Sequence, residues 1–159
     1  MIDIKSRLLD ISETTRSNTK IREIHKIILH HAPVENAGSI QNRNYINNLK
    51  YQDDIFCSYH YIIGLNGEII NLVPEDELTT NTGCLEFDLH SISIALCYFD
   101  KSICDKTLHS LNKLTNCLTK KYNLDKAYDV IRCYDVINKR SPVFFVDNQY
   151  DFFNFKHIL

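Results

Sequence analysis

Hydrophobic and polar positions change in short blocks along the chain, and these blocks predict strands interleaved with helices. The run Ile27-Ile28-Leu29, within residues 24–31, is short and β-branched, which is typical of a buried central strand. Within residues 104–122, leucines recur at three- and four-residue steps, which predicts an amphipathic helix with one apolar stripe. Further strands are predicted at 56–65, 68–73, 91–98 and 130–131, and a helix capped by Ser39 is predicted at 39–50.

Strands and helices in this order predict an α/β fold: one domain with a central mixed sheet flanked by helices. Asn66-Gly67, the strongest hairpin dipeptide, joins the second and third predicted strands. Residues 1–20 are polar and mixed, so we expect an extended N-terminal arm within a single domain of residues 1–159. Residues 75–89 form a polar stretch, and the segment after 131 is predicted to be a loop.

Composition narrows the class of protein. The chain has 159 residues, 44% of them hydrophobic, and a formal net charge of −2, which argues against a nucleic-acid binder because such domains are basic. No window reaches the roughly 18 apolar residues of a membrane span, so we expect no membrane insertion. The start of the chain has no secretory pattern, which predicts a cytoplasmic protein with reduced cysteines, most of them buried, including Cys104 and Cys117 in the core.

Three places could carry chemistry. His30-His31 ends the predicted central strand, where α/β sheets usually bind ligands. Tyr59-His60-Tyr61 puts alternate rings on opposite faces of a strand. The segment after residue 131 gathers a thiol, a carboxylate and two cations. Each place has an ordinary structural explanation as well, since buried histidines and strand tyrosines are common.

Taken in order, these segments resemble the type-2 N-acetylmuramoyl-L-alanine amidases, the superfamily of phage lysozyme-amidases and peptidoglycan recognition proteins, and most closely the clostridial and bacillar endolysin-type enzymes. The resemblance covers roughly residues 20–145. It rests on five segments in order: Ile27-Ile28-Leu29-His30-His31, Ser58-Tyr59-His60-Tyr61-Ile62-Ile63 with Asn66-Gly67, Leu72-Val73-Pro74-Glu75, Ser91-Ile92-Ser93-Ile94, and Arg132-Cys133-Tyr134-Asp135-Val136 ending at Ser141-Pro142.

The resemblance implies a zinc hydrolase that cuts the amide between the lactyl group of N-acetylmuramic acid and L-alanine. In that family three protein ligands leave one zinc position open, and the first ligand corresponds to His30. Tyr59 corresponds to a tyrosine that positions water and stabilises the tetrahedral intermediate. Lys139 corresponds to a lysine that steadies the oxyanion.

Departures from the family pattern converge on the same site. The second ligand, a histidine in the family, corresponds to Cys133, and the third, a Cys or Asp before proline, corresponds to Ser141. A thiolate can bind zinc, whereas a serine hydroxyl is a poor substitute for thiolate or carboxylate. Ala95 stands where many relatives have a glutamate, and Thr79–Gly83 lacks the aromatic ring and imidazole of their substrate loop. Asp135 and Cys57 are the candidates for a replacement ligand.

The resemblance and its departures leave three alternative functions. We favour a degenerate amidase that keeps the fold and a peptidoglycan groove but has weak or lost zinc binding and catalysis. The alternative is an active amidase with a His30/Cys133/Ser141 metal site, and the third reading makes Cys133 a nucleophile with His30 as its base. We expect peptidoglycan as the partner, reached at the cell wall after release from the cytoplasm. Residues 146–159 are too few for a separate wall-binding domain.

Overall fold

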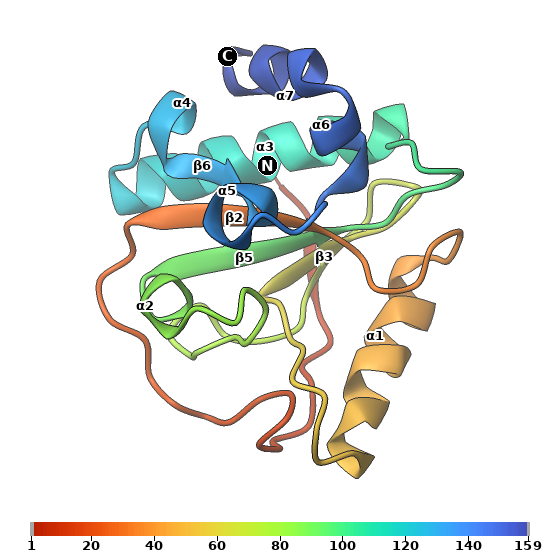
Figure 1. Ribbon diagram of the computed structural model, residues 1–159, viewed down its shortest axis with the longest axis vertical. Coiled ribbons are helices and arrows are strands. Elements are labelled where there is room, and N and C mark those ends of the chain that lie inside the picture. Colours follow the sequence, from red (N-terminus) through yellow and green to blue (C-terminus); the bar gives the residue numbers. More distant parts are fainter. Residues whose placement is uncertain (1, 159) are drawn as a thin grey trace.

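Six strands form one mixed sheet at the centre of the structure, a computed structural model that describes residues 2–158 (Figure 1). The strands are β1 (Ile4–Ser6), β2 (Lys26–His31), β3 (Tyr61–Ile63), β4 (Ile69–Asn71), β5 (Ser91–Leu96) and β6 (Val130–Arg132). Their order in the sheet is β1-β4-β3-β5-β2-β6, and only the β3–β4 pair is antiparallel. The expectation of a central mixed sheet flanked by helices is confirmed.

Helices cover both faces of this sheet. They are α1 (Ser39–Asn48), followed by the 3-10 turn η1 (Leu49–Tyr51), α2 (Leu85–Asp88), α3 (Asp105–Tyr122), α4 (Lys126–Asp129), α5 (Cys133–Ile137), α6 (Val143–Asp147) and α7 (Gln149–Lys156). In Figure 1, α3, α6 and α7 lie above the sheet and α1 lies below it. No helix among residues 2–158 is long and apolar enough to cross a bilayer.

Two apolar cores result from the alternation of strand side chains. On the α3 side, Ile27 and Leu29 of β2 pack with the apolar stripe of α3, whose Leu111 and Leu114 are fully buried. On the α1 side, Ile46 of α1 packs against alternate residues of β3 and β4. The side chain of His30, which follows Leu29, therefore points to the α1 side of the sheet.

Several predicted elements need correction. The strand predicted at 56–65 shrinks to β3, because the N–H groups of Cys57 and Ser58 donate to the carbonyls of Thr14 and Thr80 and not to a neighbouring strand. The helix at 39–50 begins after Gly38, so Ser39 is its first residue and not its cap, and its hydroxyl donates to Glu68.

The ends of the chain hold more regular structure than predicted. The supposed arm contains β1, which pairs in parallel with β4. The supposed loop after residue 131 begins with α5, and α6 and α7 follow it. The expectation that most cysteines are buried was wrong: only Cys97 and Cys133 are buried, and Cys117 is exposed on α3.

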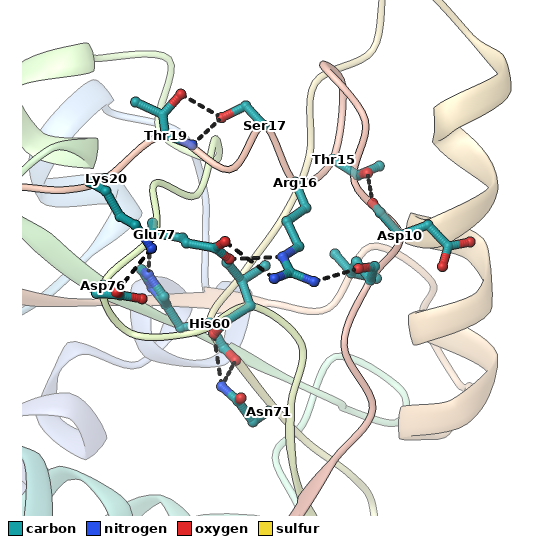
Figure 2. A network of polar contacts seen from close by, with 12 residues as sticks. Asp10, Thr15, Arg16, Ser17, Thr19, Lys20, His60, Asn71, Asp76 and Glu77 are labelled. Atoms are coloured by element: carbon teal, nitrogen blue, oxygen red, sulfur yellow. Dashed lines mark hydrogen bonds and ion pairs between the residues drawn. The ribbon is translucent and has the colours of Figure 1, made fainter.

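A partly buried ion pair joins the N-terminal segment to the segment that follows β4 (Figure 2). The Arg16 guanidinium donates to both carboxylate oxygens of Glu77, at 2.8 and 3.2 Å, and to the Leu9 carbonyl. Glu77 is 2% exposed, and its carbonyl oxygen lies 2.7 Å from Nε2 of His60. Because a carbonyl oxygen only accepts, His60 carries its proton on Nε2, and its Nδ1 accepts from the Ser93 N–H.

Candidate functional site

The carboxyl end of β2 reaches a cavity of about 300 Å³ on the α1 side of the sheet. His30, the fifth residue of β2, lines it and is only 3% exposed. Its Nε2 is buried and has no hydrogen-bond partner among residues 2–158. An unpartnered buried ring nitrogen is costly in a folded protein, so His30 is suited to receive a ligand from the cavity.

The cavity has a polar floor and an apolar mouth. Beside His30, the Tyr59 ring lies with its centroid 5.0 Å from the imidazole. Lys139 and Ser141 contribute polar groups from the segment between α5 and α6. The mouth is formed by half-exposed apolar side chains, namely Tyr45, Ile55 and Phe56. The structure therefore brings together four of the five predicted site residues: His30, Tyr59, Lys139 and Ser141.

Burial sets the protonation of the rings in this cavity. Burial, together with the charges of Lys139 and His31, lowers the pKa of His30 to about 3, while the nearby Asn81 amide acts in the opposite direction. Burial, with the Cys57 and Cys133 thiols nearby, raises the pKa of Tyr59 well above its usual value. Near neutral pH the floor thus holds a neutral imidazole and a protonated phenol.

Ser141 is engaged by the backbone at the end of β2. Its Oγ accepts a hydrogen bond from the His31 N–H at 3.1 Å, and Nδ1 of His31 accepts one from the Val143 N–H at 3.0 Å. The Tyr134 N–H donates to the Ser141 carbonyl. These bonds hold the segment that carries Lys139 against β2.

Cys133, the fifth predicted site residue, is a neighbour of His30 but does not line the cavity. β2 and β6 lie side by side and pair Leu29 with Arg132. His30 and Cys133 are the next residues after this pair. Cys133 is fully buried. Burial raises the pKa of its thiol, against the opposing charge of Lys139, which disfavours the thiolate that a cysteine nucleophile needs.

The donors present do not fit the three-ligand zinc site that the family resemblance implies. His30 offers a free nitrogen and Cys133 a buried thiol, but Ser141 offers only a hydroxyl, which is a poor zinc ligand. Asp135 is no replacement, because both of its carboxylate oxygens accept from Arg132. Within residues 2–158, no group of three or more His, Cys, Asp or Glu side chains is arranged to hold a metal ion.

Asn81 is a site residue that the sequence did not single out. It lines the cavity, and its Nδ2 donates to the Ser58 carbonyl and to Oγ1 of Thr79. The Ser58 carbonyl can only accept, so the atom that faces it must be the amide nitrogen of Asn81, and the other atom is the oxygen Oδ1. Oδ1 is left buried without a partner in the described chain. The one available signal was its place in Thr79–Gly83, the segment that departs from the family's substrate loop.

Comparison with known proteins agrees with this fold. A mutant endolysin from Bacillus subtilis superposes with a TM-score of 0.81 at 20% identity, covering 98% of this chain and 97% of that chain. The catalytic domain of XlyA also gives 0.81, at 18% identity, with 98% and 99% covered. Peptidoglycan recognition protein SD of Drosophila gives 0.66 at 16% identity, with 89% of each chain covered.

Sequence comparison gives the family. The N-acetylmuramoyl-L-alanine amidase BlyA of Bacillus subtilis (strain 168) is 23% identical over 168 residues, covering 94% of this chain. The chain spans 44% of the length of that relative. The family model for N-acetylmuramoyl-L-alanine amidases matches residues 20–143, which include His30, Tyr59, Cys133, Lys139 and Ser141. This chain belongs to the N-acetylmuramoyl-L-alanine amidase family.

Proposed function

We propose that this domain recognises peptidoglycan with the amidase fold and has weak or no zinc-dependent amidase activity. The proposal of weak or absent zinc-dependent activity rests on Ser141. This residue corresponds to the third ligand of the family, and its hydroxyl accepts a hydrogen bond from the His31 N–H. A catalytic zinc needs three good protein donors and one open position. Of the three family ligand positions, His30 is the one that keeps the family's residue type, and its Nε2 has no partner among residues 2–158.

Recognition of peptidoglycan is supported by family membership and by the shape of the cavity. The half-exposed rings of Tyr45 and Phe56 flank an opening that leads to the polar groups of His30, Asn81 and Lys139. A glycan-peptide has both the apolar sugar faces and the amide groups that such a surface would bind.

The two other functions have less support. An active amidase with a His30/Cys133/Ser141 metal site would need the Ser141 hydroxyl, a poor zinc ligand, to serve as the third donor while it also accepts the His31 N–H. A thiol hydrolase would need an accessible thiolate, and Cys133 is buried with a raised thiol pKa.

Three measurements on the 159-residue chain test the proposal. Zinc per chain is measured after purification without added metal, co-sedimentation with insoluble purified peptidoglycan measures binding, and release of L-alanine amino termini measures hydrolysis. We expect co-sedimentation, far less than one zinc per chain and little release. Stoichiometric zinc with robust release would show a working variant site, and absence of co-sedimentation would contradict recognition.

A matched pair of aromatic variants localises the binding. Phe56→Ala removes a ring that is 51% exposed at the mouth of the cavity and should weaken co-sedimentation. Tyr128→Ala removes a ring that is 76% exposed on α4 and does not line the cavity, so it should leave binding unchanged. Equal loss in the two variants would contradict binding at this cavity.

A further inference from the structure

The cavity beside His30 contains a cation and no acidic side chain. Lys139 is among its lining residues, and no Asp or Glu is. Within residues 2–158, none of the ion pairs involves Lys139. The neighbouring Arg140, in contrast, is paired with Asp147. The cavity therefore carries a positive charge that is in no ion pair within the described chain.

Two buried polar atoms at the floor of the cavity define what a ligand must bring. Nε2 of His30 and Oδ1 of Asn81 both lack partners within the described chain. The Asn81 oxygen can only accept, so a ligand that reaches it can offer an N–H or O–H. The Lys139 ammonium can only donate, so it requires an acceptor, and an ionised acceptor makes the stronger bond.

The residue at the third ligand position also favours an anion. A cysteine thiolate or an aspartate there would bring a negative charge beside His30, which would repel a carboxylate. Ser141 brings a neutral hydroxyl, whose oxygen already accepts from the His31 N–H. A carboxylate can therefore approach the floor without a like charge opposing it.

We propose that this cavity binds a carboxylate that lies next to an N–H or O–H donor, with the carboxylate at Lys139 and the donor at Asn81. The inference rests on the recognition of peptidoglycan proposed above. Peptidoglycan offers this chemistry in two places: the free lactyl carboxylate of a muramic acid that has lost its peptide, and the terminal carboxylate of a stem peptide. The lactyl carboxylate is a product of amidase hydrolysis, so the domain would bind peptidoglycan from which an amidase has already removed the peptide.

Calorimetric titration with matched small ligands tests the carboxylate. N-acetylmuramic acid is compared with its neutral methyl ester and with N-acetylglucosamine, and N-acetyl-D-alanine is compared with its amide. We expect each acid to bind about tenfold or more tightly than its neutral counterpart, because the Lys139 ammonium donates a stronger hydrogen bond to an ionised acceptor than to a neutral one. Whichever acid binds more tightly identifies the source. Equal binding of the acids and their neutral counterparts overturns the proposal.

Substitutions of Lys139 test whether its positive charge binds the carboxylate of the ligand. Lys139→Gln should weaken binding of the acid about tenfold or more, while Lys139→Arg should retain it within a few fold. Lys113→Gln removes another exposed lysine, on α3 and outside the cavity, and should have no effect. An unchanged affinity in Lys139→Gln overturns the site.

Co-sedimentation with peptidoglycan separates this inference from the proposed function. A protein that sediments with the wall but does not distinguish acids from neutral ligands keeps the proposed function and loses the carboxylate site. A protein that selects acids but does not sediment keeps the site and loses wall recognition.

Discussion

The hydroxyl oxygen of Ser141 accepts a hydrogen bond from the backbone N–H of His31, across 3.1 Å and 110 residues of sequence. With the bond from the Val143 N–H to Nδ1 of His31, it joins the end of the central strand to the segment between α5 and α6. These hydrogen bonds between protein atoms hold the two segments together.

Replacing Ser141 by alanine should destabilise the fold. The His31 N–H would lose its partner, which costs about 1–3 kcal/mol when the group stays buried. For a chain of this length that corresponds to a fall in Tm of a few degrees, roughly 2–4 °C per kcal/mol. Ser102→Ala is the control, because Ser102 is exposed and should change stability by less than about 0.5 kcal/mol. Equal melting of the two variants would contradict the role of Ser141.

Restoring the family ligands should create a zinc site. The double variant Cys133→His and Ser141→Cys, together with His30, supplies three good donors and leaves one position open. We expect zinc affinity to rise by orders of magnitude, measured by competition with a chromogenic chelator, and zinc to raise Tm because it binds only the folded state. Amidase activity should recover less than affinity, because Ala95 and the Thr79–Gly83 segment are unchanged. Tight zinc binding by the unmodified chain would contradict the premise.

Two ion pairs in Figure 2 should differ in their contribution to stability. Arg16→Met leaves Glu77, 2% exposed, without its partner, and losing one member of a buried pair costs about 3–5 kcal/mol. Lys20→Met breaks an exposed pair with Asp76, which is worth about 0–1 kcal/mol. Urea unfolding of both variants measures the difference. Similar losses would mean that the Arg16 pair does not fasten the N-terminal segment.

The free energy of unfolding should fall as the pH is lowered, because buried histidines resist protonation in the folded state. Burial lowers the pKa of His60 to about 4, whereas in the unfolded chain it is about 6.5. Between these values the unfolded state binds a proton that the folded state does not, so stability is lost as pH falls below 6.5. For His60 the loss at pH 5 is about 2 kcal/mol relative to pH 7. His30 and His31, with lowered pKa values of about 3 and 4, act in the same direction.

Urea unfolding at pH 7 and pH 5 measures this dependence, and His60→Gln tests its assignment. The variant lacks the titrating ring, so its stability should change less between the two pH values, whatever its absolute stability. A slope equal to that of the unmodified chain would show that His60 does not contribute.

Elements whose pattern is local could be predicted from the amino-acid sequence. The β-branched run before His30 predicted β2, the leucine spacing predicted α3, and Asn66-Gly67 predicted the β3–β4 hairpin. Each depends on residues within one or two turns or along one strand, where side-chain periodicity reports which face is buried. The order of the family segments also identified the fold, and the family match over residues 20–143 confirms it.

The way in which distant segments meet could not be predicted from local patterns and is seen in the fold. β1 shows no strand pattern because all its residues are exposed, and it forms by pairing with β4 more than 60 residues away. The burial of Cys133, the bond between Ser141 and His31, and the unpartnered oxygen of Asn81 likewise depend on residues far apart in the chain. Sequence position gave the candidate ligands, but whether an atom is free to bind depends on what the fold places within hydrogen-bond distance of it, and local patterns carry no record of those partners.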